Sequence, residues 1–225
     1  MNKTIDWDTH KFHCSGLPHL MTNSRSKGDI LSETAKSYLR DVYVQEVFGR
    51  TKIEMIGNKY TKKGIECETD TIELISRVTG KTYFKNNEEL FNDYIVGTPD
   101  ITKPDLIDVK TSWNLHTFAA VDEKKAMKDY FWQMVGYMWL TDNIKSDLIY
   151  GLVNTPEDSI KYALYQLSFS IPEDLTEQYR NNFVFDDIPE EIRIKRFPIS
   201  MEDQSIDLIT ERIIAAREYM KTLSL

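Results

Sequence analysis

The sequence predicts an α/β fold in which helices flank a central mixed β-sheet. Hydrophobic residues first recur with a helical period, then alternate along short segments, and return to a helical period towards the end of the chain. The 225 residues are 41% hydrophobic, and no Pro-, Gly- or Ser-rich linker interrupts them. We therefore expect residues 1–225 to form a single domain.

Two helices are predicted before Gly80. The first runs from Leu31 to Phe48, and Ser32 carries a hydroxyl of the kind that often begins a helix. The second runs from about Tyr60 to Arg77, and Gly80 follows it as glycine often follows the last turn of a helix.

A β-hairpin is predicted next, because the hydrophobic period changes after residue 93. Its strands are Tyr94 to Asp100 and Leu106 to Thr111, with a turn near Lys103 to Asp105. Successive residues of a strand point to opposite faces, so Asp108 and Lys110 share one face.

The remaining elements are predicted as a helix, two strands and a last helix. The helix runs from about Glu123 to Leu140, and the strands are Leu148 to Val153 and Tyr162 to Ser170. The closing helix has roughly 23 residues and can be capped by Ser200. Its apolar side is predicted to consist of Ile206, Ile209, Ile213, Ala216, Met220 and Leu223.

Composition limits the classes of protein to which the chain can belong. No segment approaches the roughly 20 apolar residues of a membrane span, and the first residues lack the apolar core of a signal peptide. We expect a cytoplasmic protein that does not bind membranes. Cys14 and Cys67 alone imply no disulfide framework. The net charge of −8 argues against nucleic-acid binding only weakly, since the local distribution of charge decides it.

The residues most suggestive of chemistry lie in the predicted hairpin. Asp100 ends one strand and Asp108 lies within the next, so the two carboxylates can converge. Oxygen ligands of this kind suit Mg²⁺ or Mn²⁺, and the Val109 carbonyl could add another. Lys110 lies on the face of Asp108, where it could hold a water and stabilise negative charge on a phosphodiester. The simpler alternative is a turn aspartate beside an exposed ion network, but Asp108 has apolar neighbours in sequence.

Two further patterns accompany this segment. Gly64 and Glu68 lie on the preceding helix, where a carboxylate could point towards the hairpin. Gln133 and Tyr137 share one helix face at i, i+4 spacing. Taken alone, the first is more often a solvated helix face and the second more often the polar edge of a core.

Taken together, these motifs resemble the PD-(D/E)XK nuclease superfamily, and within it the phage lambda exonuclease and YqaJ-type viral recombinase nucleases. The resemblance rests on an ordered set of short motifs between about residues 20 and 140: Thr22-Asn23-Ser24, Gly64 to Glu68, Pro99-Asp100, Asp108-Val109-Lys110, and Gln133 with Tyr137-Met138-Trp139. It implies a restriction-endonuclease-like core.

The resemblance also implies a role for each matching residue. Glu68, Asp100, Asp108 and the Val109 carbonyl would bind Mg²⁺, with Mn²⁺ as a substitute. Lys110 would position the attacking water, and Gln133 would assist near the metal or the DNA. The residues expected to contact DNA are Ser24, Arg25, Lys62, Lys63 and Tyr137.

Members of the family degrade the 5′-ended strand of linear duplex DNA and leave a 3′ single strand for a recombinase partner. The resemblance therefore implies DNA ends as substrate, a single-strand annealing recombinase as partner and a ring-shaped trimer. The chain departs from the family in having no arginine between Ser15 and Leu20, where the family binds the 5′-phosphate. Arg25 or Lys27 could take its place.

Three alternatives remain open at this point. The same core could serve a structure-specific or restriction-like endonuclease, or a DNA-binding protein without activity. Alternatively, His10, His13, Cys14 and His19 could bind zinc, although their spacing is loose and no second cysteine pair lies nearby.

Overall fold

The computed structural model describes residues 4–52, 59–170, 172 and 177–224. In this part of the chain the strands form two three-stranded mixed sheets. The smaller sheet has the order β1-β3-β2, with strands Phe12–His13, Ile95–Gly97 and Leu90–Phe91. The larger sheet has the order β4-β5-β6, with strands Ile107–Thr111, Lys145–Gly151 and Ile194–Ser200. β5 is parallel to β4 and antiparallel to β6.

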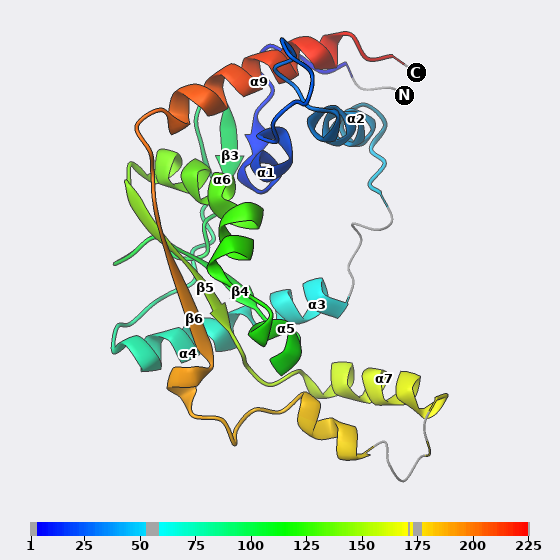
Figure 1. Cartoon of the computed structure of the whole chain (residues 1–225), viewed down its shortest axis with the longest axis vertical. Coiled ribbons are helices and arrows are strands. Elements are labelled where there is room, and N and C mark those ends of the chain that lie inside the picture. The colour runs from blue at the N-terminus through cyan, green and yellow to red at the C-terminus, as the bar shows by residue number, and fades with distance from the viewer. Residues whose placement is uncertain (1–3, 53–58, 171, 173–176, 225) are drawn as a thin grey trace.

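Helices surround both sheets (Figure 1). The α-helices are α1 (Leu17–Leu20), α2 (Glu33–Phe48), α3 (Lys59–Glu66), α4 (Glu68–Thr79), α5 (Leu115–Ala119), α6 (Glu123–Thr141), α7 (Glu157–Ser168) and α9 (Ser205–Lys221). Short 3-10 helices are η1 (Cys14–Gly16), η3 (Glu177–Asn182) and η4 (Glu190–Ile192). No described helix is both long and apolar enough to cross a membrane.

The larger sheet lies between α6 and α4. Leu148 of β5 belongs to the hydrophobic cluster that contains Met134 of α6, whereas Ile149 belongs to the cluster that contains Ile72 and Ile75 of α4. Neighbouring strand residues point to opposite faces, so one face of the sheet contacts α6 and the other contacts α4.

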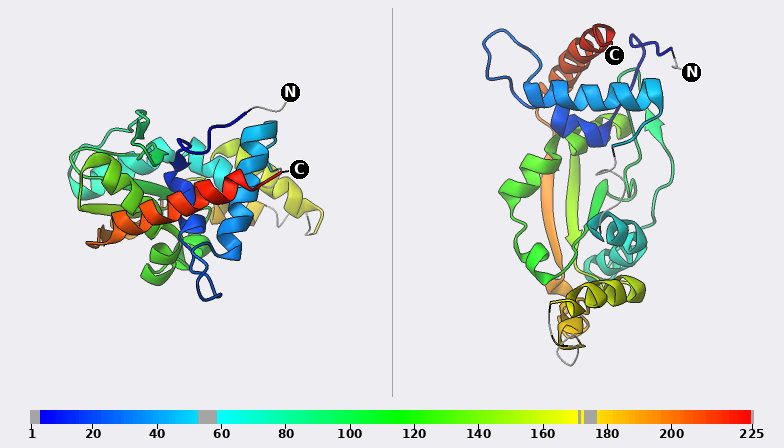
Figure 2. Two further views of the ribbon diagram at one scale, coloured as in Figure 1. Left: turned by 90° about the horizontal axis from the view of Figure 1, so that it is seen from above. Right: turned by 90° about the vertical axis from the view of Figure 1, so that its right-hand side faces the viewer.

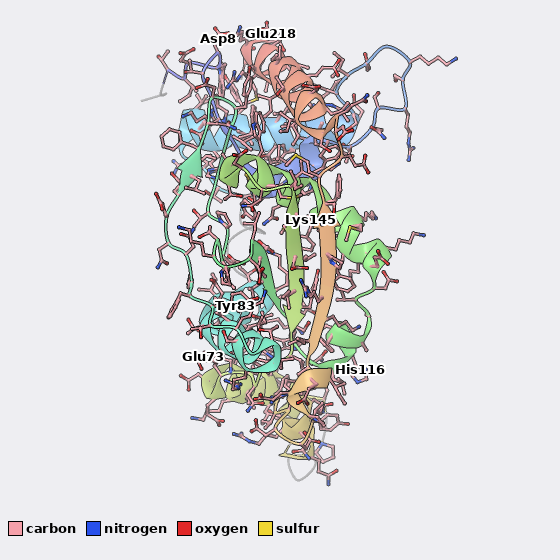
Figure 3. All side chains as sticks on the ribbon, turned by 90° about the vertical axis from the view of Figure 1, so that its left-hand side faces the viewer. Asp8, Glu73, Tyr83, His116, Lys145 and Glu218 are labelled. Carbon is pink, nitrogen blue, oxygen red and sulfur yellow. The ribbon has the colours of Figure 1, made fainter. Side chains whose placement is uncertain are left out.

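The molecule is elongated along the strands of this sheet. α2 and α9 lie at one end and α7 lies at the other, with β4, β5 and β6 running between them (Figure 2). Lys145, at the start of β5, lies towards the α9 end, and His116 of α5 lies towards the opposite end (Figure 3). The sheet therefore connects the two ends of the molecule.

The predicted α/β class and several helix boundaries are confirmed. Ser32 caps α2 by accepting a hydrogen bond from the Ala35 N–H, and Gly80 follows α4 with a left-handed φ of 67°. α6 occupies almost the predicted range. The predicted helix from Tyr60 to Arg77 is divided into α3 and α4 at Cys67.

The predicted hairpin is wrong, although its turn is present. β3 has β1 and β2 as its neighbours, so both of its edges are already paired. β4 belongs to the other sheet. Next to the turn, Ile101 and Ile107 form an isolated antiparallel bridge, and no hairpin ladder between β3 and β4 follows from it in the described part of the chain.

The predicted strand Tyr162 to Ser170 is also wrong, because the chain there forms α7. The alternation of hydrophobic residues in that segment resembles a strand, but Ile160 and Leu164 are spaced one helical turn apart. Both pack against Trp113 and Phe183, and this tertiary contact stabilises the helix.

At the end of the chain, Ser200 ends β6 rather than capping a helix. β6 was not predicted, and α9 begins at Ser205 after Gln204, which makes no side-chain cap. The apolar stripe of α9 is largely as predicted, with four of its residues buried and two partly buried: Ile209, Ile213, Ala216 and Met220 are buried, and Ile206 and Leu223 are partly exposed.

Candidate active site

Asp108 and Lys110 lie side by side on the face of β4 that is turned towards α6. Asp108 is in register with Leu148, which contacts α6, and is only 1% exposed. The Lys110 ammonium lies 2.6 Å from Asp108 Oδ2, and about a quarter of the Lys110 side chain is exposed. The strand alternation that the sequence predicted thus places an acid and an amine together.

α6 supplies the polar groups opposite this pair. Gln133 donates from Nε2 to Asp108 Oδ1 at 3.0 Å and to the Tyr137 hydroxyl at 3.1 Å. Tyr137 packs closely over Gly97, where an added Cβ would lie 2.8 Å from its ring. The small residue at the end of β3 therefore makes room for Tyr137, which orients Gln133 towards Asp108.

Asp100 approaches β4 from its free edge. Asp100 Oδ2 accepts a hydrogen bond from the Val109 N–H at 2.6 Å, in the position that a neighbouring strand would otherwise fill. In an extended strand the N–H and C=O of one residue point to the same side, so the Val109 carbonyl faces the Asp100 edge. Asp100 and Asp108 thus reach the strand from adjacent directions.

Mutual repulsion and burial dominate the electrostatics of these groups. Burial and the neighbouring Asp108 carboxylate raise the pKa of Asp100 to about 7, against the opposing effects of Lys110 and the Val109 N–H. For Lys110, burial lowers the pKa, but the carboxylates of Asp108 and Asp100 outweigh it and hold the pKa above its usual value. The site therefore keeps a charged ammonium among carboxylates that repel one another.

Glu68 begins α4 and adds a third carboxylate near the site. Its charge raises the pKa of Asp100 further, which places it within electrostatic reach of that residue. Glu68 Oε1 forms an ion pair at 3.0 Å with the ammonium of Lys85. The helix motif predicted from the sequence therefore does bring Glu68 towards Asp100.

The donor set suits a hard divalent cation, but the carboxylates do not form a finished metal cluster. Among the described residues, no three His, Cys, Asp or Glu side chains lie close enough together to hold a metal ion. Glu68 Oε1 and Asp108 Oδ2 are nevertheless buried and accept no hydrogen bond from the described part of the chain. Ammonium groups contact both oxygens, and Mg²⁺ prefers oxygen ligands of this type.

A solved structure of a phage-related exonuclease from Haemophilus somnus 129PT is similar to this chain over nearly its whole length. The two sequences are 33% identical, the match covers 94% of each chain, and the TM-score is 0.74. The chain belongs to the phage-related exonuclease family. The family resemblance predicted from the motifs is confirmed.

More distant structures share the fold of this exonuclease family member. An alkaline exonuclease from Laribacter hongkongensis, LHK-Exo, is 15% identical with a TM-score of 0.59, and the match covers 96% of this chain and 91% of that one. Its complex with dAMP is 16% identical with a TM-score of 0.58, with 94% and 88% covered. No family model and no curated protein matched the sequence.

The two lysines predicted to contact DNA differ in their exposure to solvent in this exonuclease family member. Lys62 is exposed and lies 3.8 Å from Glu66 on the same helix. Lys63 is completely buried, and its ammonium donates to the Trp113 carbonyl at 3.0 Å. Burial lowers the pKa of Lys63 to about 8. Lys63 therefore lies under the surface, away from the position that a phosphate contact requires.

Ser24 and Arg25 lie in the loop between α1 and α2. The Ser24 hydroxyl accepts from the Ser26 N–H at 3.1 Å, and Arg25 is exposed. This loop belongs to the α2 and α9 end of the exonuclease, whereas α4, which carries Glu68, lies towards the other end (Figures 1 and 2). The structure thus brings Asp100, Asp108, Lys110 and Gln133 together, with Glu68 within electrostatic reach of Asp100, and leaves Ser24 and Arg25 in a separate loop.

The alternative zinc site is not formed within the described residues, which contain no cluster able to hold a metal. Cys14 is buried, and its sulfur lies where a Cβ on Gly97 or Gly136 would be 2.9 Å away. Burial raises the pKa of this thiol to about 12. Cys14 therefore acts as a small packing residue between β3 and α6.

Two residues of the site were not predicted from the sequence. Tyr130 of α6 places its ring 4.8 Å from the Lys110 ammonium. Tyr130, Gln133 and Tyr137 follow i, i+3, i+7 spacing, and this shared helix face was a signal that could have identified Tyr130. Lys85, by contrast, lies in an irregular segment without any motif.

Proposed function

We propose that the chain is a Mg²⁺-dependent exodeoxyribonuclease that resects the 5′-ended strand of linear double-stranded DNA. The observation that carries the proposal is the Asp108–Lys110 pair beside Asp100 on β4, in a member of the phage-related exonuclease family. Buried acids grouped around one ammonium are costly to a protein unless they serve a ligand or a reaction.

Each residue of the site has a role in this proposal. Glu68, Asp100, Asp108 and the Val109 carbonyl would hold Mg²⁺. When bound, the cation would polarise the phosphodiester and offset its negative charge. Lys110 would orient the attacking water and stabilise the charge that develops on the phosphate oxygens. Gln133 would keep Asp108 in the orientation that binding requires.

Hydrolysis by this arrangement would break one P–O bond of the DNA backbone at each step. Water supplies the new oxygen on phosphorus, and the leaving oxygen takes up a proton. Repeated cleavage from the 5′ end would leave a 3′ single-stranded tail, which is the substrate of a single-strand annealing recombinase. A ring-shaped trimer around the DNA, as the family resemblance implies, would keep the enzyme on one strand between steps.

The direct test uses linear duplex DNA labelled at either the 5′ or the 3′ ends, together with closed circular DNA of the same sequence. With Mg²⁺ we expect early release of the 5′ label as short products, a 3′ label retained on long strands, and intact circles. EDTA should stop all release. Cleavage of circles would support the endonuclease alternative, and early release of the 3′ label would reverse the proposed polarity.

A further inference from the structure

Glu68 and Lys85 form an ion pair in which one buried oxygen of Glu68 lacks a hydrogen bond within the part of the chain that the structure describes. Lys85 lies in the segment between α4 and β2, and its ammonium is 3.0 Å from Glu68 Oε1. This oxygen is buried and accepts no hydrogen bond of normal geometry from any described residue. The charge of Lys85 therefore balances an oxygen that no other described group satisfies.

Lys85 is held much less firmly than Lys110. Lys110 contacts Asp108 and the Tyr130 ring, and its side chain is 25% exposed. Lys85 is 41% exposed, and in the described part of the chain Glu68 is the partner of its ammonium. An exposed lysine with one partner can change that partner at small energetic cost.

The same segment contains a lysine that differs in this respect. Lys81 lies 2.6 Å from Asp105 Oδ2, which also accepts a hydrogen bond at 2.6 Å from the Tyr83 hydroxyl. Asp105 is thus satisfied by two groups and belongs to the turn before β4. Lys81 carries the same charge as Lys85, and its side chain has a similar exposure of 50%, but its partner is the aspartate of a turn. Lys81 therefore provides a matched control for Lys85.

We propose that Lys85 is an exchangeable internal cation of the active site: it neutralises Glu68 in the metal-free enzyme, yields that carboxylate when metal binds, and then contacts a phosphate of the DNA. This rests on the proposed function. Two cations that share one carboxylate repel each other, so occupancy of Glu68 by a divalent cation favours departure of the ammonium. The released Lys85 would remain next to Glu68, which lies within electrostatic reach of Asp100, and a phosphate of bound DNA would be its new partner.

The proposal couples metal binding to DNA binding through one side chain. Lys85 opposes metal binding while it occupies Glu68, and it becomes available to DNA only after release. Coupling of this kind is reciprocal, so metal should strengthen DNA binding and DNA should strengthen metal binding. Replacement of Lys85 should remove this part of the coupling.

The first measurement titrates Mg²⁺ alone into DNA-free protein by calorimetry. We compare the wild type with Lys85→Met, Lys85→Arg and Lys81→Met. The competition predicts that Lys85→Met binds Mg²⁺ about threefold to fivefold more tightly than the wild type, in keeping with the strength of an exposed ion pair. Lys85→Arg and Lys81→Met should stay within about twofold, because a cation still faces Glu68 in both.

The second measurement follows binding of a fluorescently labelled duplex by anisotropy, in EDTA and in Ca²⁺, with electrophoresis to check that the DNA stays intact. Lys85→Met should match the wild type in EDTA and bind more weakly in Ca²⁺. There, the slope of log affinity against log salt should fall by about 0.9, the value for one phosphate contact. Lys81→Met should follow the wild type in both conditions.

The outcomes separate this proposal from the function on which it rests. Equal or weaker Mg²⁺ binding by Lys85→Met would overturn the competition, and an equal loss of DNA affinity in EDTA and Ca²⁺ would overturn the exchange. Similar effects in Lys81→Met would assign the results to net charge alone. A wild type that binds no Mg²⁺ would instead contradict the metal dependence of the proposed function, and the role of Lys85 with it.

Discussion

Asp108 Oδ2 and the Lys110 ammonium lie 2.6 Å apart on one face of β4, and Asp100 is hydrogen-bonded to the residue between them in sequence. One short strand thus carries an acid and an amine and holds a second acid at its edge. The strand is held in turn by β5 along one edge and by Asp100 at the other. The positions of Asp108 and Lys110 follow from sheet geometry, and Asp100 is held against the strand by its hydrogen bond to Val109.

Replacement of Lys110 by Met should lower the rate of DNA cleavage by about 100- to 1000-fold, because the developing negative charge loses its nearest cation. Lys110→Arg should restore little activity, since the planar guanidinium does not fit the position of a compact ammonium. Initial rates on linear duplex at saturating Mg²⁺ provide the measurement. Activity of Lys110→Met close to that of the wild type would exclude the proposed role.

Gln133→Leu should weaken Mg²⁺ binding or activity by about tenfold to 100-fold, because Asp108 loses the group that orients it. Tyr137→Phe removes only the hydroxyl that contacts Gln133, so we expect a smaller change in the same direction. Calorimetric titration of Mg²⁺ and a thermal unfolding curve distinguish loss of orientation from loss of folding. An unaltered Mg²⁺ affinity and rate in Gln133→Leu would show that this hydrogen bond is dispensable.

The raised pKa of Asp100 predicts a pH dependence of stability in EDTA. The pKa of this carboxyl is about 7 in the folded protein, whereas unfolding returns the pKa to its ordinary value of 3.8. The protonated Asp100 carboxyl therefore contributes stability that is fully present below the unfolded pKa and is lost as the pH rises through 7. Over this range the free energy of unfolding falls by up to about 1.4 kcal/mol for each pH unit. Denaturant unfolding of the wild type and Asp100→Asn measures it. The free energy of unfolding should fall from pH 5 to pH 8 more steeply in the wild type than in Asp100→Asn, and parallel curves would contradict the account.

Lys63 predicts the opposite slope at higher pH. Its pKa is about 8 in the folded protein, against an ordinary value of 10.5 for an exposed lysine, so the unfolded chain binds more protons between these values. The free energy of unfolding should therefore rise over this window by up to about 1.4 kcal/mol for each pH unit, as the cost of a buried charge is relieved. Lys63→Met should lack this rise. Stability curves of both proteins between pH 8 and 10 test it, and an equal rise in Lys63→Met would assign the effect to other groups.

Local patterns in the sequence were sufficient for the centre of the site. Strand alternation correctly places Asp108 and Lys110 on one face, and helical spacing correctly places Gln133 and Tyr137 on another. These relations depend only on the period of a single element. The family resemblance adds Glu68, whose approach to Asp100 depends on how α4 packs against β4.

The elements that the sequence did not predict depend on contacts between distant residues. β6 is defined by its pairing with β5, and α7 by the packing of Ile160 and Leu164 against Trp113. Neither partner can be recognised from the local pattern of the segment itself. Lys62 and Lys63 are adjacent and chemically alike, so the sequence alone does not show which of them is buried. In the structure Lys63 is the buried one, and its ammonium donates to the Trp113 carbonyl.

The most direct test of the central claim compares two buried aspartates of the same sheet. Asp108 faces Lys110 in the proposed active site, whereas Asp147 of β5 pairs with Arg196 of β6 through two hydrogen bonds. Nucleotide release from linear duplex with Mg²⁺ should fall by about 1000-fold or more in Asp108→Asn. Asp147→Asn, assayed below its unfolding temperature, should retain activity within about fivefold of the wild type, since it alters stability rather than chemistry. Full activity in Asp108→Asn, or equal loss in both variants, would contradict the assignment of the active site.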